Sequence, residues 1–215
     1  MMKYFLLITI LLITYLNVNA QGIGEIVPPK PPEKFPNNAL GIDIMFSEGG
    51  FGLGGFYRRQ LSETVTAFSD ISISEATDPR EFTYVDYYGN TYTAGKVNRA
   101  FLIPLNFGLQ YRLFENALTD NLRPYINLGV GPSIVMTTPY AEEYFSAFKN
   151  AHAQFTLGGY IGFGANFGID KSNLVGLNLR YYVIHLFNRG IEILQGRNEK
   201  NLGGFFLTIN LGTMY

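Results

Sequence analysis

The last eleven residues, 205–215, constrain the fold more than any other part of the chain. Their odd positions read Phe, Leu, Ile, Leu, Thr and Tyr, whereas their even positions read Phe, Thr, Asn, Gly and Met. Successive side chains of a β-strand point to opposite faces, so one face is an apolar stripe that ends in an aromatic ring. A soluble sheet buries such a stripe, but a membrane barrel turns it toward lipid around a polar interior.

The same alternation recurs along the chain and predicts an all-β fold, an eight-stranded antiparallel up-and-down transmembrane β-barrel. The expected strands are 40–46, 51–59, 64–74, 101–113, 125–136, 154–167, 175–183 and 205–215. Connections on one rim are short, whereas the opposite rim carries the long segments 75–98, 137–151 and 187–202. This asymmetry is typical of outer-membrane barrels, whose short turns face the periplasm.

The N-terminal residues predict export across a membrane. Lys3 precedes a mostly apolar stretch from Tyr4 to Leu16, and Val18-Asn19-Ala20 offers a small-residue cleavage site. The stretch is shorter than the roughly 20 residues that a membrane-spanning helix needs, which favours a cleavable signal peptide over an anchor. We therefore expect a signal peptide at 1–20, a proline-rich periplasmic segment at 21–38 and the barrel at 39–215. The prolines favour an extended spacer, although Pro28 and Pro31 also fit a PxxP recognition motif.

Composition excludes several classes of protein. Without Lys3, 15 basic and 17 acidic side chains remain, so the mature chain has no electrostatic footprint for nucleic acid. The chain has no cysteine, which excludes disulfides, thiolate metal sites and a lipid-anchored cysteine. The expected partner is outer-membrane lipid, in a Gram-negative bacterium.

Outward-facing aromatic residues near the ends of three strands predict two girdles at the membrane interfaces. Ten residues at about 3.4 Å each, tilted by about 40°, rise about 26 Å, which matches the apolar band of such barrels. The girdle residues are Phe101, Tyr111, Phe155, Phe167, Phe205 and Tyr215.

These features resemble the small outer-membrane β-barrel proteins represented by OmpA transmembrane domains, OmpX and OmpW. The likeness rests on the signal ending at Ala20, the alternating strands, the start of one strand at 123–131, and the terminal pattern Leu207-x-Ile209-x-Leu211-x-Thr213-x-Tyr215. The terminal pattern resembles the signal that the barrel-assembly machinery reads, which implies that machinery as a partner. Thr213 stands where an aromatic residue is common, and Tyr215 replaces the usual Phe.

Polar residues with inward parity form the best-defined constellation in the sequence. They would either plug a narrow barrel with ion pairs and hydrogen bonds or line a selective pore. An eight-stranded barrel is only wide enough for side chains to fill, which favours the plug. The predicted lumen network is Asp43, Arg58, Asp70, Asn106, Gln110, Arg112, Arg123, Asn127, Asn166, Asn178, Arg180 and Asn210.

Catalytic and metal-binding patterns are weak. Gly50-x-Gly52-x-x-Gly55 matches a dinucleotide fingerprint but lies in a strand pattern without the required following helix. His152 and His185 lie near loop ends, without the spacing of metal ligands. Ser133 faces the lumen, whereas His185 has outward parity near the long-loop rim, so no nucleophile and base come within reach. We therefore expect no enzymatic activity, no cofactor and no metal.

The long loops hold the remaining candidates for function. Residues 81–88 and 91–94 are expected to form a hairpin around Gly89-Asn90 that prolongs two strands outside the membrane. Its aromatic residues, and those of 140–149, either recognise an extracellular partner or pack the loops together. The expected function is surface or partner interaction through these loops. The alternative is a narrow conduit for small or hydrophobic solutes.

Overall fold

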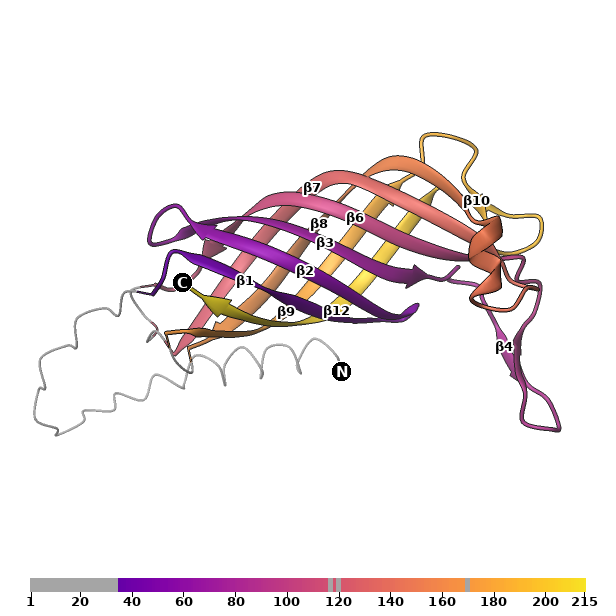
Figure 1. Ribbon diagram of the computed structural model, residues 1–215, viewed down its shortest axis with the longest axis horizontal. Helices are drawn as coiled ribbons and strands as arrows, with labels where there is room; N and C mark the ends of the chain where they lie inside the picture. Colours follow the sequence, from indigo (N-terminus) through magenta and orange to yellow (C-terminus); the bar gives the residue numbers. More distant parts are fainter. Residues whose placement is uncertain (1–34, 116–117, 119–120, 169–170) are drawn as a thin grey trace, which may run out of the picture. The chain divides into compact units, whose positions relative to one another are not determined.

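The computed structural model describes residues 35–115, 118, 121–168 and 171–215. The predicted signal peptide and most of the proline-rich segment lie outside this range. Eight strands form a closed antiparallel barrel in the order β1-β12-β9-β8-β7-β6-β3-β2, which confirms the predicted fold class (Figure 1). The barrel strands are β1 (Asn38–Ser47), β2 (Gly50–Gln60), β3 (Val65–Ala76), β6 (Asn98–Arg112), β7 (Leu122–Pro139), β8 (His152–Phe167), β9 (Asn173–His185) and β12 (Asn201–Met214).

The first and last barrel strands close the sheet. β1 pairs with β12 from Ala39 opposite Met214 to Ser47 opposite Phe206. Asn38 and Tyr215 exchange both backbone hydrogen bonds, at 3.1 and 2.9 Å. Closure leaves no unpaired strand edge, which a membrane-embedded sheet requires because lipid offers no hydrogen-bond partners.

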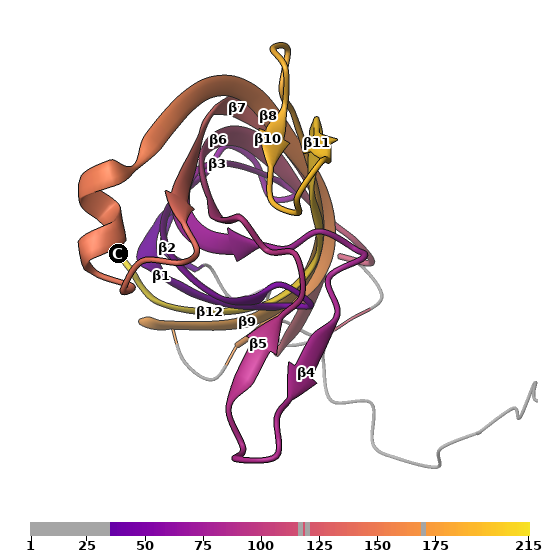
Figure 2. The same cartoon turned by 90° about the vertical axis from the view of Figure 1, so that its right-hand side faces the viewer.

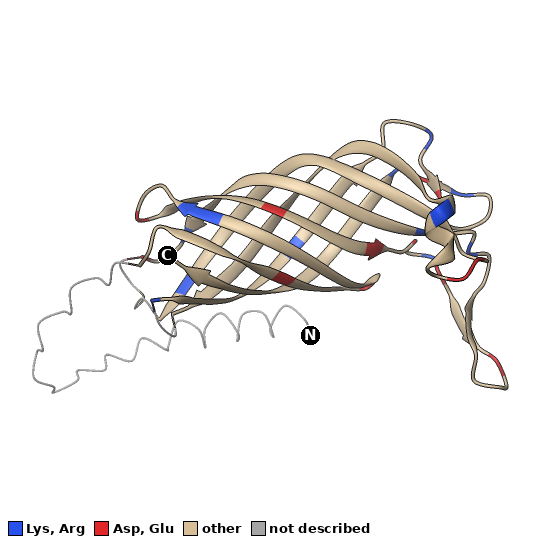
Figure 3. Cartoon of the chain, viewed as in Figure 1, with Lys and Arg blue, Asp and Glu red and all other residues tan. Residues whose placement is uncertain are grey.

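The two faces of the wall follow the alternation of the sequence. Outward Leu128 is 63% exposed and outward Phe107 is 54% exposed, whereas inward Met45 is 1% exposed. Charged residues lie mainly toward the two rims, with a few in the middle of the barrel wall (Figure 3). Asp43, Asp70 and Arg180 are buried. No helix among the described residues is long and apolar enough to span a bilayer.

The long connections carry the remaining short elements (Figure 2). β4 (Thr83–Val85) and β5 (Thr91–Thr93) form a separate two-stranded sheet between β3 and β6. The 3₁₀ helix η1 (Ser146–Asn150) lies between β7 and β8, and β10 (Ile191–Glu192) pairs with β11 (Asn198–Glu199) between β9 and β12.

The outer mouth of the barrel is closed by an apolar cluster. The connection between β9 and β12 hydrogen-bonds to the one between β3 and β6: the amides of Val97 and Gln195 donate to Ile193 and Gly95, each at 2.8 Å. Beneath these bonds lie the buried side chains of the mouth cluster: Ala76, Ala100, Leu102, Val135, Ile184, Leu186, Ile191, Ile193 and Leu202. Burial of a large aliphatic side chain stabilises by about 1.5–3 kcal/mol, so this connection is firmly held at the rim.

Two local features differ from the sequence prediction. The β4–β5 hairpin does not prolong the barrel strands, because Asp78 and Pro79 interrupt the ladder after β3 and Pro79 has no amide hydrogen to donate. β12 begins at Asn201, four residues before the predicted start at Phe205. Gly203 and Gly204 hide the alternation there, and both adopt positive φ angles of 126° and 136°.

Candidate functional site

A layer of paired charges crosses the middle of the lumen. Arg180 Nη2 lies 2.7 Å from Asp43 Oδ2, and Arg180 Nη1 lies 3.9 Å from Asp70 Oδ2. The Tyr160 hydroxyl donates to Asp70 at 2.7 Å, and the Asn106 amide donates to the same carboxylate at 2.8 Å. Arg180 and both carboxylates are at most 3% exposed. Two carboxylates therefore balance the charge of one guanidinium, and the neutral donors Tyr160 and Asn106 hydrogen-bond to the Asp70 carboxylate.

The other predicted lumen residues continue this layer toward the short-turn rim. Arg58 donates to Asn166 at 3.2 Å and stacks on Phe56 at 4.3 Å. Asn210 donates to Asp43, and Arg123 stacks on the Phe35 ring at 3.9 Å. Gln110, Asn127 and Asn178 are buried, and Arg112 is half-buried.

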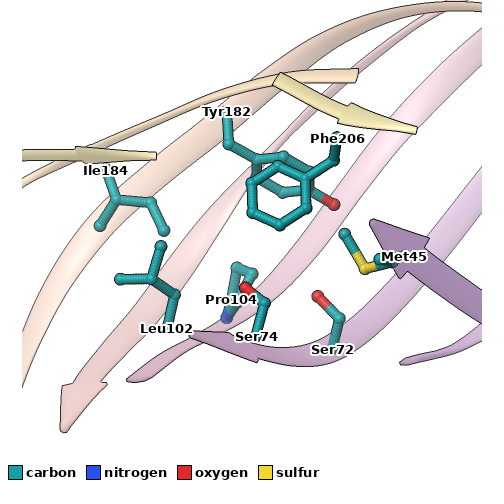
Figure 4. A pocket seen from close by; sticks show the side chains of 8 residues that line it. All are labelled: Met45, Ser72, Ser74, Leu102, Pro104, Tyr182, Ile184 and Phe206. Atoms are coloured by element: carbon teal, nitrogen blue, oxygen red, sulfur yellow. The ribbon is translucent and has the colours of Figure 1, made fainter. Parts of the chain in front are cut away.

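Above the charged layer, the lumen is filled by aromatic and aliphatic side chains (Figure 4). The rings of Tyr182 and Phe206 meet edge to face at 5.2 Å. The gaps between these side chains total about 170 Å³ and are too narrow to admit a water molecule. It is lined by Met45, Ser72, Ser74, Leu102, Pro104, Tyr182, Ile184 and Phe206.

A second polar constellation lies on the outside of the same wall. His185 ends β9 at the long-loop rim, and Asn201 begins β12 directly opposite it. His185 Nδ1 lies 2.6 Å from Asn201 Oδ1, and both side chains are exposed. An amide oxygen only accepts hydrogen bonds, so it holds the proton on Nδ1 and leaves the Nε2 lone pair free. An imidazole fixed in this way has the form of a general base.

The surroundings of His185 are apolar on the membrane side and cationic on the loop side. Leu157 lies opposite it on β8, and the Phe187 ring meets the imidazole edge to face at 5.3 Å. Arg189 and Lys200, both exposed, stand in the connection that joins β9 to β12. An apolar wall below and cations above suit an amphiphilic ligand at the membrane interface.

The predicted girdle residues lie on the outer face, with one difference. Phe155 is 78% exposed and Phe205 is 65% exposed. Phe101 is only 5% exposed, because Phe148 of η1 and the preceding Tyr144 pack on it, with ring centroids at 5.4 and 6.3 Å. The loop between β7 and β8 therefore covers this part of the wall. Tyr111, Phe167, Tyr215, Leu207 and Leu211 are exposed, and Ile209 is half-buried between neighbouring outward side chains.

The closed barrel, its apolar outer wall and its two unequal rims define a small Gram-negative outer-membrane β-barrel protein. Within that class, the chain belongs to the lipid A 3-O-deacylase (PagL) family, whose model matches residues 71–199. The match covers more than half of the chain and includes His185.

Solved structures of two outer-membrane proteins are similar to this chain, and the one with a TM-score above 0.5 supports the fold. Neisserial surface protein A matches with a TM-score of 0.53 and 11% identity, over 85% of this chain and 100% of that one. OprG from Pseudomonas aeruginosa matches with a TM-score of 0.44 and 14% identity, over 85% of this chain and 97% of that one. No curated protein sequence matches.

The family overturns the expectation that this chain is not an enzyme. That expectation rested on seeking a nucleophile for His185 among inward residues such as Ser133, which lies on the other side of the wall. It also overlooked Asn201, because this residue falls within the expected loop 187–202. The available signal was a polar pair, His185 and Asn201, at outward positions where a lipid-facing strand would carry apolar residues. Among the described residues, no group of three or more His, Asp or Glu is placed to hold a metal ion.

Proposed function

We propose that this protein hydrolyses an acyl ester of a lipid A-type glycolipid in the outer membrane, at a site on the outer wall that is centred on His185. The observation that carries the proposal is the His185–Asn201 pair at the long-loop rim, within a chain of the deacylase family. A 3-O-deacylase removes an acyl group from an oxygen atom, so the bond that breaks is an ester. Ester hydrolysis needs a base, and His185 is oriented for that role.

The position of His185 supports an interfacial substrate. Long loops of outer-membrane barrels face the cell exterior, so the end of β9 lies at the outer interface. Exposed Phe155, Phe187 and Phe205 lie near this level, and aromatic residues mark the depth of lipid headgroups. A glycolipid in the outer leaflet would present the junction between its sugar and its acyl chains at the same depth. The substrate therefore needs no passage through the lumen.

The protein refolded in detergent should release free fatty acid from purified lipid A, as measured by mass spectrometry of both products. His185→Gln should lower the rate by about 10²–10⁴-fold, the usual contribution of a general base. The chain offers a matched control, because His152 is its one other histidine. His152 is also exposed, at the start of β8. Equal loss of activity in His152→Gln, or full activity in His185→Gln, would refute the assigned site.

Surface contact through the outer loops is a second proposed role, favoured by the β4–β5 hairpin. Tyr87 is 98% exposed and Tyr88 is 86% exposed at its tip. Two such rings, which lose little conformational entropy on binding, suit recognition of a partner or of the glycolipid surface. Tyr87→Ser combined with Tyr88→Ser should weaken binding to vesicles that contain lipopolysaccharide and leave the barrel folded. Unchanged binding would remove the support for this role.

The structure gives no support to a conduit. The mouth cluster closes one end of the lumen, and the Arg180 layer fills its middle. Planar-bilayer recordings should therefore show no steady single-channel conductance.

A further inference from the structure

Among the described residues, the neighbours of His185 on the outer face of the wall offer no nucleophile. The side chains next to His185 on its own face are Leu157 and Asn201 across the ladder, Val183 two residues before it and Phe187 two residues after it. Leu157, Val183 and Phe187 carry no polar atom, and Asn201 is already engaged with Nδ1. The chain has no cysteine.

The hydroxyl that does contact His185 is unsuited to attack a substrate. Thr156 donates its hydroxyl hydrogen to the backbone carbonyl of His185, not to the imidazole. Its side chain points into the barrel and is 7% exposed. An ester held on the lipid side of the wall would be separated from Thr156 by the backbone of the sheet itself.

We propose that the nucleophile is water, activated directly by His185 Nε2, and that no acyl-enzyme forms. This inference rests on the proposed hydrolysis at His185. The imidazole is exposed, and the cationic loop side of the site is open to solvent. Water therefore reaches Nε2 from the rim, while the acyl chains of the substrate lie against Leu157 and Phe187.

The reaction balances without a further reactant. Nε2 takes one proton from water as the water oxygen forms a bond to the ester carbonyl carbon. The tetrahedral intermediate then breaks its bond to the sugar oxygen, and the imidazolium returns the proton to that oxygen. The products are a fatty acid and an alcohol, and His185 is regenerated. Asn201 acts as a positioning residue, because it holds the ring in the tautomer that this sequence needs.

The test compares direct and covalent pathways in the full-length mature protein. Enzyme in excess over lipid A is quenched with acid on a millisecond-to-second scale, and intact-protein mass spectrometry searches for an added acyl mass. In parallel, the protein is incubated with a fluorophosphonate, which labels activated serine and threonine hydroxyls. We expect no acyl adduct, no burst of alcohol release ahead of fatty acid, and no inhibition by the fluorophosphonate.

Variants separate the two pathways further. Thr156→Val and Ser133→Ala should each keep the rate within about threefold of wild type, with folding checked by heat-modifiable gel migration. An acyl adduct mapped to any hydroxyl residue would overturn the inference. Loss of activity in a folded Thr156→Val protein, to the level of His185→Gln, would overturn it as well. Failure of the proposed function would look different, since wild-type protein would then release no fatty acid at all.

Discussion

Strands β9 and β12 carry two polar constellations on opposite faces of the barrel wall. Comparing them shows which polar residues stabilise the fold and which can act on a ligand. Inside the barrel, Arg180 of β9 and Asn210 of β12 are buried and bonded to Asp43. Outside, His185 of β9 and Asn201 of β12 bond to each other, and both side chains are exposed. A buried charge that is paired with carboxylates from other strands holds those strands together, whereas a positioned imidazole with a free lone pair can act on a ligand.

The inner layer should account for the largest effect on stability. Arg180→Met leaves the carboxylates of Asp43 and Asp70 buried without their cation, which should cost about 3–5 kcal/mol in unfolding free energy. Urea titration of protein folded in lipid vesicles measures this loss. The matched control is Arg189→Met, an exposed arginine on the loop beside the outer site, which should change stability by less than about 0.5 kcal/mol. Equal effects at the two arginines would show that the lumen layer does not stabilise the barrel.

The lipid face of β12 should give the next largest effect. Ile209 points outward between Ile44 and Leu177, so Ile209→Arg should cost about 2–4 kcal/mol if it lies near the bilayer midplane. Thr208→Val tests the neighbouring inward position. The Thr208 hydroxyl is buried without a hydrogen-bond partner, so its replacement by a methyl group should be nearly neutral. A large loss for Thr208→Val together with a small loss for Ile209→Arg would reverse the assignment of the two faces.

At the outer site, removal of the positioning group should reduce turnover and leave the fold intact. Asn201→Ala frees the imidazole to rotate, and loss of such positioning costs about 10²-fold in rate. The reduction should fall on kcat, with KM little changed, because Asn201 contacts His185 and not the substrate. Unchanged stability against urea would confirm that the effect is local.

The conservative variant Asn201→Asp sharpens this test. A carboxylate keeps the hydrogen bond to Nδ1 and also favours the protonated imidazolium. Since His185 must be neutral to accept a proton, the fall in activity at low pH should begin at higher pH than in wild type. An identical pH profile would argue against His185 as the base.

The sequence predicted the inner constellation far better than the outer one, for a physical reason. Strand parity depends on a period of two, so the inward side of Asp43, Asp70 and Arg180 could be read from the alternation. The pairing of His185 with Asn201 depends instead on the register between β9 and β12, which periodicity does not encode. Gly203 and Gly204 also hid the start of β12, so Asn201 was assigned to a loop.

The way in which the long connections fold against the barrel was not predicted either, for a similar reason. The outward parity of Phe101 was read correctly, but its burial beneath Phe148 and Tyr144 depends on how the connection between β7 and β8 folds back. The hairpin at 81–94 was expected from its turn residues, whereas its separation from β3 and β6 follows from the interruption at Asp78 and Pro79. Contacts between distant segments decide such features, and local composition does not specify them.

The smallest expected effect concerns the turn of the β4–β5 hairpin, which lies far from both constellations. Hydrogen bonds from the side chain and the backbone amide of Asn90, and from the amide of Tyr88, lower the pKa of the Asp86 carboxyl below its usual range. A group whose pKa is lower in the folded state stabilises that state above the unfolded pKa of about 3.9, and the stabilisation is lost as pH falls through the folded value.

The amide resonances of Tyr88 and Asn90 should therefore titrate together, with a midpoint below that of a free aspartate. Asp86→Asn should abolish this titration and leave ester hydrolysis at neutral pH unchanged. A change in hydrolysis would mean that the hairpin and the outer-wall site are coupled. The outer constellation could then no longer be treated as independent of the loops.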